Sequence, residues 1–320
     1  MRFLAPVFRP RPEHRPLSTA PRAPSLRIRW LGTAGHILET PGATLLLDPF
    51  LSRPGLLRTA LSPLEPQPEA WAHWLPERVD AVLVGHSHYD HLMDAPVIAK
   101  RKGALLVGSA TTCAFAQAAG VPASQRIEVG GAGRTLEIGD MRVRFVPSQH
   151  GRLFAGRVPF PGEQREPPPL PARVHHYRMG GAFGLHIETP YGAVYHNGSA
   201  DLIDAELEGR RADVLLVGLA GRYATRDYLP RLLRLLGSSL VIPTHHDYFF
   251  GAMEDGCRLL PGVDLRGFFE QLGELSPGTR IITPTYEDVV HVPERAAEAV
   301  VVAGLSGPTR PSRSPSERSR

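Results

Sequence analysis

The sequence predicts an α/β (α+β) protein in which two β-sheets pack face to face and carry helices on their outer sides. Segments with the strand period alternate with helical segments in both halves of the chain. Gly and Pro, 32 residues each, are frequent between these segments and indicate many turns. An apolar share of 42% in 320 residues supplies a core for one large domain or two ordinary ones.

Both ends of the chain differ in composition from the body. We expect a disordered Pro/Arg-rich tail over residues 1–25, a single ordered domain over residues 26–305 and a disordered Ser/Arg-rich tail over residues 306–320. The tails carry charges of +4 and +3, while the whole chain carries +4, so the body is left with −3. The basic balance therefore belongs to the tails, and a nucleic-acid-binding face is not demanded.

Composition also limits the cellular setting. No stretch reaches the roughly 18 apolar residues that a transmembrane helix needs, and Pro6 interrupts a short apolar N-terminus that makes a poor signal peptide. Cys113 and Cys257 are too few for a disulfide scaffold. We therefore expect a cytoplasmic protein with two reduced thiols and no transmembrane segment.

The elements expected in the first half begin with strands. Residues 26–31 alternate apolar and polar side chains, and a strand pair follows around the Pro41-Gly42 turn. In order, we expect strands over 26–31, 36–40 and 44–48, loop and helix over 51–78, a buried strand over 80–84, a helix over 96–101, a strand over 105–108 and a helix over 111–119.

The second half repeats this alternation. We expect meander strands of a second sheet over 126–129, 134–138 and 141–147, a strand pair over 183–189 and 193–196, strands over 213–218, 240–243 and 280–284, and helices over 201–210, 227–236 and 265–275. Residues 151–173 hold six prolines and no apolar period, so they form a long loop. Long loops inside a compact domain are usually functional.

Four strong metal ligands fall within the six residues from His86 to His91, directly after the apolar run Ala81–Gly85. On an extended segment the side chains at i and i+2 share a face, so His86 and His88 can hold one ion. Asp90 and His91 follow where the chain turns and can hold a second ion. Imidazole and carboxylate ligands suit zinc, manganese or iron.

Three later strand ends add candidate ligands. His150 follows the expected strand 141–147, the turn Asn197–Asp201 follows the strand 193–196, and His245 follows the strand 240–243. His246 is an alternative to His245 under a one-residue shift. Because each candidate comes directly after a strand, their loops can converge on one pocket.

These motifs resemble the metallo-β-lactamase superfamily of metallohydrolases, whose signature is His-x-His-x-Asp-His. The resemblance runs from about Leu26 to His291. The stretches Trp30–His36 and Leu45–Phe50 are similar to the branch that contains ascorbate-6-phosphate lactonase and the phospholipase D that cleaves N-acyl-phosphatidylethanolamine. The fold that the resemblance implies is a four-layer αββα sandwich with the metals at one edge of the sheets.

The resemblance also implies a ligand set for two divalent ions, zinc first and Mn²⁺ or Fe²⁺ as alternatives. Asp48 would orient a ligand histidine, and Asp90 would be the catalytic carboxylate. A carboxylate from the turn Asn197–Asp201 would bridge the two ions. By motif, the first ion would take His86, His88 and His150, and the second would take Asp90, His91 and His245.

One position departs from the family pattern. Relatives commonly have Gly-Asp at the bridging position, whereas here Gly198 is followed by Ser199. A neutral hydroxyl offsets no cation charge, so we expect Asp201 to be the bridge. Its alternative role is to cap a helix N-terminus, in which case the second ion binds weakly or not at all.

The remaining candidates concern the substrate. We expect Arg152, His176, Tyr177 and His246 to contact it, with surface or hydrogen-bonded side chains as the alternative, and His36 and His196 to be structural.

The function implied is hydrolysis of an ester, lactone or phosphodiester bond in a small-molecule or lipid-like substrate by a metal-bound hydroxide. The rivals are a mononuclear-iron sulfur oxygenase on the same fold and a non-catalytic metal-binding protein.

Overall fold

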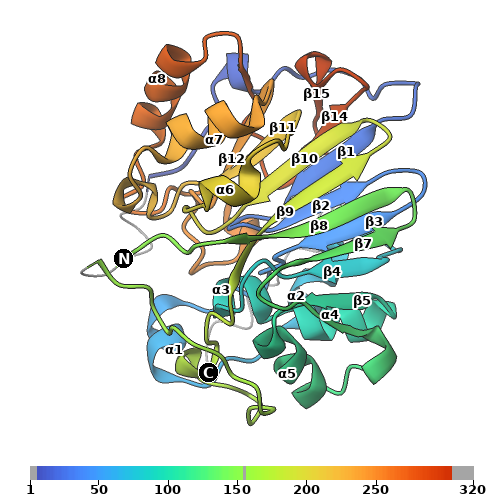
Figure 1. Cartoon of the computed structure of the whole chain (residues 1–320), viewed down its shortest axis with the longest axis vertical. Helices are drawn as coiled ribbons and strands as arrows, with labels where there is room; N and C mark the ends of the chain where they lie inside the picture. Colours follow the sequence, from blue (N-terminus) through green and yellow to red (C-terminus); the bar gives the residue numbers. More distant parts are fainter. Residues whose placement is uncertain (1–5, 154–155, 305–320) are drawn as a thin grey trace, which may run out of the picture.

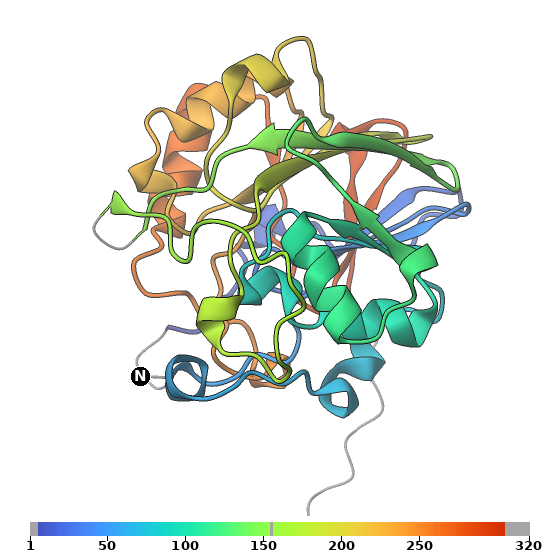
Figure 2. The same cartoon turned by 60° about the horizontal axis from the view of Figure 1, so that its bottom comes forward.

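A computed structural model describes residues 6–153 and 156–304 of the 320-residue chain. Two β-sheets lie face to face in the middle of the molecule, and helices cover the outer side of each sheet (Figure 1). The turned view in Figure 2 separates the four layers, with helices from the C-terminal half on one side and helices from the N-terminal half on the other. The predicted two-sheet architecture is thus confirmed.

The first sheet is built mainly from the N-terminal half. Its order is β15-β14-β1-β2-β3-β4-β5-β6. The strands are β1 (Leu26–Trp30), β2 (His36–Glu39), β3 (Thr44–Leu47), β4 (Ala81–Leu83), β5 (Leu105–Gly108), β6 (Arg126–Glu128), β14 (Val289–Val292) and β15 (Val300–Val302). Strands β3 to β6 run parallel, so the loops after β4 and β5 leave the same edge of the sheet.

The second sheet is built from the C-terminal half and has the order β13-β12-β11-β10-β9-β8-β7. Its strands are β7 (Arg134–Ile138), β8 (Met141–Ser148), β9 (Ala182–Thr189), β10 (Gly192–Asn197), β11 (Val214–Gly218), β12 (Leu240–Thr244) and β13 (Arg280–Ile281). Strands β10 to β13 are parallel, which sends the loops after β10, β11 and β12 to a common edge.

Helices from each half cover the sheet of that half. The first half contains α1 (Leu56–Leu61), α2 (Pro68–Trp71), α3 (Tyr89–Leu92), α4 (Ala95–Lys102) and α5 (Ala110–Ala118), and the second contains α6 (Asp204–Leu207), α7 (Tyr228–Leu236) and α8 (Leu265–Leu275). Short 3₁₀ helices lie at Pro12–His14, Ala72–Trp74, Ala123–Gln125, Val174–His176, Arg222–Ala224, Met253–Asp255 and Ala296–Glu298. Helix α7 buries Leu229, Leu232 and Leu236 against the second sheet, as its 3.6-residue period predicts.

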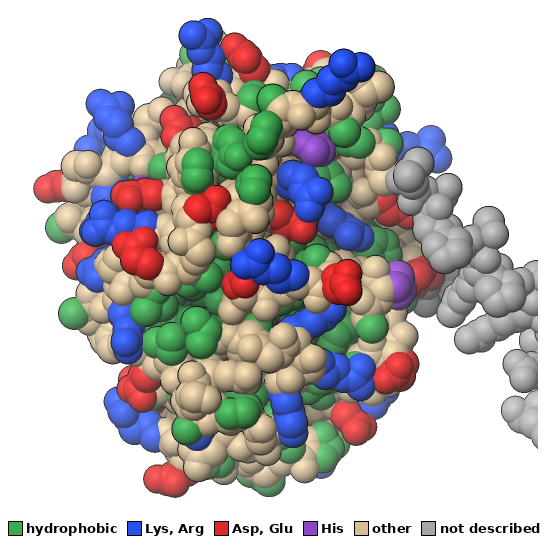
Figure 3. Space-filling view, turned by 90° about the vertical axis from the view of Figure 1, so that its right-hand side faces the viewer, with side chains coloured by type: hydrophobic (Ala, Val, Ile, Leu, Met, Phe, Trp, Pro, Cys, Tyr) green, Lys and Arg blue, Asp and Glu red, His purple; other side chains and the backbone are tan. Residues whose placement is uncertain are grey.

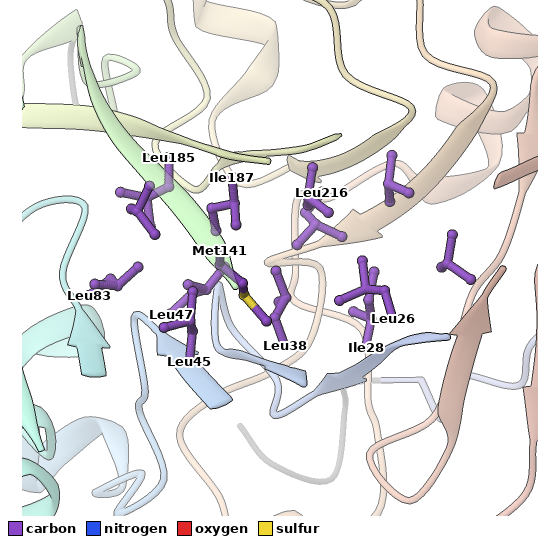
Figure 4. Close-up of a cluster of buried hydrophobic side chains, with 14 of the residues drawn as sticks. Leu26, Ile28, Leu38, Leu45, Leu47, Leu83, Met141, Leu185, Ile187 and Leu216 are labelled. Atoms are coloured by element: carbon purple, nitrogen blue, oxygen red, sulfur yellow. The ribbon is translucent and has the colours of Figure 1, made fainter. Parts of the chain in front are cut away.

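The core between the sheets is made by the inward residues of alternating strand positions. Leu26, Ile28, Leu38, Leu45 and Leu47 point from the first sheet toward the second (Figure 4). Met141, Leu185, Ile187 and Leu216 meet them from the opposite side. The alternate residues of the first sheet, such as Trp30, Ile37 and Leu46, belong to a separate cluster under the outer helices. Burial on both faces explains why these strands are apolar nearly throughout.

Three expectations about elements need correction. Strand β6 pairs with β5 and therefore belongs to the first sheet rather than the second. The helix expected over residues 201–210 is limited to α6, Asp204–Leu207. Strands β14 and β15 were not expected, although they complete the edge of the first sheet beside β1. Their short apolar runs give no periodicity that separates a strand from a loop.

The N-terminal segment is also different from the expected disordered tail. Residues 6–25 lie along the body, where Val7 bridges to Arg258 and Leu17 bridges to Val301. The guanidinium of Arg15 donates two hydrogen bonds of 2.7 Å to the buried carboxylate of Asp288. A Pro/Arg-rich segment remains disordered when it has no surface to pack against, and here the folded domain provides such a surface. Residues 1–5 and 305–320 lie outside the described residues.

The surface carries charges of both signs. Figure 3 shows the right-hand side of the view in Figure 1, where Arg or Lys side chains and Asp or Glu side chains are interspersed. This face therefore presents no broad field of one sign. In the described ranges, no helix combines the length and the apolar character that crossing a membrane requires.

Candidate metal centre

The predicted ligands converge at one edge of the sandwich. His86 follows β4 of the first sheet, whereas His150 and His245 follow β8 and β12 of the second sheet. Asp90 and His91 lie on the short helix α3, which begins directly after His88. Two groups of potential ligand atoms result, each with all its atoms within 4.8 Å of one another. The groups are His86, His88 and His150, and Asp90, His91 and His245.

The first group contains three neutral donors. The ring centroids of His86 and His88 lie 4.8 Å apart, and each lies 4.7 Å from that of His150. His86 and His88 are buried. Burial and the neighbouring imidazoles hold the pKa of His86 well below its usual value, and burial with the nearby His88 lowers that of His150 to about 3. Neutral imidazoles are the form that binds a metal ion.

The second group contains the carboxylate. Asp90 Oδ2 lies 3.4 Å from His245 Nε2 and 3.8 Å from His91 Nε2. Burial alone would raise the pKa of Asp90, but the imidazoles of His91 and His245 outweigh it and hold the pKa below its usual range. The side chain is therefore ionised at neutral pH. The ring of His91 also lies 3.8 Å from that of His86, centroid to centroid, so the two groups are adjacent.

The ring nitrogens are arranged as metal ligands require. His88 Nε2 lies 2.8 Å from the carbonyl oxygen of Pro159, and His150 Nδ1 lies 2.7 Å from that of Gly151. Because a carbonyl oxygen only accepts, these nitrogens carry the protons and leave the other nitrogen of each ring as an electron-pair donor. His86 Nε2 is buried without a hydrogen-bond partner among the described residues. Such an atom is costly unless an ion satisfies it, so the residues fit a metal ion.

Asp48 contacts a histidine of the second group. Its Oδ2 lies 3.1 Å from His91 Nδ1 and 3.0 Å from His196 Nε2, while its Oδ1 accepts a hydrogen bond from the backbone of Gly85. Burial would raise the pKa of Asp48, but the two imidazoles outweigh it and lower the pKa. The charged carboxylate thus orients His91 with Nε2 toward Asp90. His196 and His36 are fully buried beside it and serve as structural residues.

A second buried network supports His245. The backbone nitrogen of His245 donates to Thr33 O, and Thr33 N donates to Asp247 Oδ1 at 2.8 Å. Asp247 Oδ2 accepts from the Arg53 guanidinium and from the Tyr286 hydroxyl. The side chains of Arg53 and Asp247 are 1% and 0% exposed. A buried ion pair with these additional hydrogen bonds fixes the loop from which His245 projects.

The backbone is constrained at the same places. Asp48 and His245 adopt φ angles of +41° and +56°, a region that L residues avoid. At Gly85 an added Cβ would lie 3.0 Å from the carbonyl oxygen of Phe183. Gly32 has a φ of +77°, and a side chain there would clash with the Arg53 guanidinium. These glycines therefore allow the close approach on which both supporting networks depend.

The structure does not bring Asp201 to the ligand groups. Its Oδ1 accepts a hydrogen bond from Leu202 N and lies 3.9 Å from Arg231 Nη1. It does not cap α6 either, since the N-cap is Ile203 without a side-chain bond. Ser199 reaches the cavity beside His150 instead, and its hydroxyl donates to Gln149 O. The expected bridge is thus corrected: a turn of two further residues directs Asp201 toward α7.

The four expected substrate residues do not line the cavity at the metal centre. Tyr177 is buried and stacks on Phe115 at 4.3 Å between ring centroids. His246 is fully buried and stacks on Trp30 at 4.6 Å, which explains why burial lowers its pKa to about 4. His176 Nδ1 accepts a hydrogen bond from its neighbour Arg173, and Arg152 points to solvent. A position close in sequence to a candidate ligand or to the long loop therefore does not determine whether the side chain faces the cavity.

The cavity has a volume of about 420 Å³ and opens over the ligands. Its lining residues include His88, Asp90, His91, His150 and His245. Apolar side chains form the rest of its wall, chiefly Leu153, Phe160, Phe249, Phe250, Leu260 and Val263. The long loop over 151–173 thus contributes to the site, as its length predicts. Sequence reasoning missed the apolar wall, although the aromatic run Tyr248–Phe250 shortly after His245 could have indicated it.

Arg53 and Tyr286 were also missed. They are separated from Asp247 by 194 and 39 positions along the chain, and neither belongs to a recognisable motif. They meet because the segment after β12 packs against the loop after β3, which carries Arg53, and against the segment between β13 and β14, which carries Tyr286.

Comparison with known proteins agrees with this geometry. Residues 27–245 match the family model described as a β-lactamase superfamily domain. A Methanopyrus kandleri protein named UPF0173 metal-dependent hydrolase is 30% identical over 79% of this chain and 98% of its own. A Pyrobaculum arsenaticum protein of the same name is 30% identical over 70% of this chain and 85% of its own.

A solved structure shows the same fold. The metallo hydrolase Igni18 from Ignicoccus hospitalis superposes with a TM-score of 0.51 at 17% identity, covering 88% of this chain and 100% of its own. At this identity the likeness concerns the fold alone. Taken with the matched family model, which spans most of the chain, these findings show that the chain belongs to the metallo-β-lactamase superfamily.

Proposed function

We propose that this chain is a metal-dependent hydrolase that cleaves an ester, lactone or phosphodiester bond at the His/Asp centre. The observation that carries the proposal is the pair of adjacent ligand groups at the floor of one cavity. The names of the Methanopyrus kandleri and Pyrobaculum arsenaticum relatives, which cover most of this chain, support the same activity.

Two divalent ions fit the centre, one in each group, with zinc as the first candidate. Imidazole nitrogen and carboxylate oxygen are ligands that zinc prefers, and manganese or iron are the alternatives. When bound, such ions lower the pKa of a coordinated water to about 7 and polarise the substrate oxygen. His86, His88 and His150 would hold one ion, and Asp90, His91 and His245 the other.

Asp90 has a further role beyond holding an ion. Its carboxylate remains ionised at neutral pH because His91 and His245 keep its pKa low. It also lines the cavity, so it can accept a hydrogen bond from the attacking water and orient the oxygen lone pair toward the substrate carbon or phosphorus. Asp48 keeps His91 in place while this happens, through the contact at His91 Nδ1.

Replacement of the ligands tests the proposal. Purified protein, stripped of metal and reloaded separately with Zn²⁺, Mn²⁺ or Fe²⁺, is assayed on p-nitrophenyl acetate, a γ-lactone and bis-p-nitrophenyl phosphate. We expect the variants His88→Ala and Asp90→Ala to lose metal-dependent turnover. The variant Asp213→Ala removes a carboxylate that bonds the backbone of Ala193, away from the centre, and should retain it. Turnover that survives both ligand replacements would overturn the assignment.

Metal analysis of protein purified without added metal provides a second test. About two zinc or manganese ions per chain would support hydrolysis at a binuclear centre. One iron per chain together with oxygen-dependent turnover of a thiol or persulfide would overturn the proposal in favour of the oxygenase alternative.

A further inference from the structure

We propose that the substrate of this centre carries an extended, uncharged apolar group beside the scissile bond. The proposal rests on the proposed hydrolytic function and narrows it. It identifies substrates with an uncharged aliphatic or aromatic arm, such as apolar esters and lactones, as the substrate class. The cavity of about 420 Å³ above the ligands carries the inference through the chemistry of its wall.

The wall is formed by apolar side chains from three separate segments. Leu153 and Phe160 come from the long loop after β8, whereas Phe249 and Phe250 lie four and five residues after His245. Leu260 and Val263 form the third segment of the wall. The two phenylalanines pack on each other with ring centroids 4.6 Å apart, and Phe249 also meets the ring of His245 at 5.4 Å. A surface that begins at a ligand and continues over two aromatic rings favours an apolar substrate group.

The apolar wall lacks the partner that a charged group on the substrate arm needs. None of the described residues that line it is Arg or Lys. Arg152, beside Leu153 in sequence, points to solvent, and Arg222, beside Gly221, bonds instead to Gln271 and Tyr223. A phosphate or carboxylate placed against the wall would lose its hydration without gaining a cation or a hydrogen-bond donor.

Three polar side chains at the cavity already make hydrogen bonds. The Ser199 hydroxyl donates to Gln149 O, and His88 Nε2 donates to Pro159 O. The outward nitrogen of His150 is bonded to Gly151 O. Recognition of a substrate by hydrogen bonds from these side chains would require breaking existing ones, so binding energy comes from apolar contact.

Replacement of Leu153 gives the most specific test of the apolar wall. This leucine is half-buried, lines the cavity and belongs to none of the described core clusters, so its replacement alters the wall with little effect on folding. The chain at Gly221 approaches it so closely that a Cβ there would lie 2.6 Å from Leu153 Cδ2. Leu57 on α1 is 76% exposed and lies outside the cavity lining, which makes it a matched control.

The first experiment measures turnover by the full-length, metal-loaded protein. The substrates are p-nitrophenyl esters of straight-chain acids from acetate to octanoate and the p-nitrophenyl monoester of succinate. We expect kcat/KM to rise about fourfold for each added methylene until the cavity is filled. The succinate monoester should fall about 100-fold below the butyrate ester, which has the same chain length. A flat or falling series, or preference for the succinate monoester over the butyrate ester, would overturn the inference while leaving hydrolysis intact.

The second experiment tests the wall without turnover. N-phenyl-1-naphthylamine, an uncharged apolar fluorophore, is titrated into metal-free protein. We expect binding with increased fluorescence, displaced by octanamide, with roughly tenfold weaker affinity in Leu153→Arg and unchanged affinity in Leu57→Arg. In the turnover assay, Leu153→Arg should raise the ratio of succinate to butyrate hydrolysis.

The two experiments separate the possible failures. Probe binding that responds to Leu153→Arg, without turnover of any ester or lactone, would reject the proposed hydrolysis and retain the apolar site. Equal probe affinity in both arginine variants would show that the fluorophore binds elsewhere and would reject the apolar site.

Discussion

The two ligand groups of the metal centre are held in different ways. His86, His88 and His150 form a neutral set whose described outer contacts are the backbone carbonyls of Pro159 and Gly151. The group of Asp90, His91 and His245 carries a charge and is supported by two buried carboxylates, Asp48 and Asp247. Each of these carboxylates is anchored to several other elements. The second group therefore depends on buried charged side chains that lie far from it in sequence, whereas the first group depends on the conformation of the neighbouring loops.

Among the variants that test this difference, Arg53→Met should cause the largest loss of stability. It leaves the buried carboxylate of Asp247 without its cation, so we expect the free energy of unfolding to fall by about 3–5 kcal/mol. Urea denaturation of metal-free protein measures it. The double variant Arg53→Met/Asp247→Leu should recover part of the loss, because the uncompensated charge is gone. Stability equal to that of the parent would show that this network does not support the second group.

The variant Asp48→Asn should weaken the second group without unfolding the protein. The amide lacks the charge that orients His91, and we expect the affinity for the second ion to fall about 10–100-fold. Competition with a chelator, read by metal content, measures both ions. Asp94→Asn is the matched control, since Asp94 is equally buried but bonds to Leu51 and Ser52. Equal loss of both ions in Asp48→Asn would contradict the asymmetry.

The variant Ser199→Asp should place a second carboxylate beside the first group, which has none of its own. Only one carboxylate, that of Asp90, belongs to the six ligands, so two dications leave a large positive charge. A second carboxylate at the cavity should tighten binding of the second ion by on the order of tenfold. It should also destabilise the metal-free protein by about 1–3 kcal/mol through burial of an unpaired charge. Chelator competition and urea denaturation test these opposite signs, with Ser199→Asn as the uncharged control.

The variant Asp201→Asn should have the smallest effect. Its side-chain oxygen contacts Leu202 N and the half-buried Arg231, so we expect unchanged metal content and a loss of stability below about 1 kcal/mol. Metal analysis by mass spectrometry decides the point. Loss of one ion from this variant would restore Asp201 as the bridging ligand and would require the Ser199–Asp201 turn to move.

The strands of both sheets could be predicted from the sequence in most cases because their apolar runs are bounded by Gly, Pro and Asn. Strand β5 has the predicted bounds, Leu105–Gly108. Strand β14 could not be predicted, since its pairing with β1 spans most of the chain, and β15 pairs with β14 in turn. The candidate ligands could be identified because His-x-His-x-Asp-His and the strand-end histidines are local patterns. The direction in which Asp201 points depends on how distant segments pack. The structure places its carboxylate toward Arg231 on α7 and not at the bridging position that we expected.

The sequence by itself determined the candidate ligand residues and the two-sheet fold that presents them. Both follow from short-range patterns, in which side-chain period and ligand spacing are properties of a few adjacent residues. The tertiary structure alone decided that Asp247 pairs with Arg53, that Ser199 rather than Asp201 reaches the cavity, and that Leu153, Phe249 and Phe250 line it. These outcomes depend on the packing of distant segments, where burial determines which charges need partners and which apolar side chains face the same space.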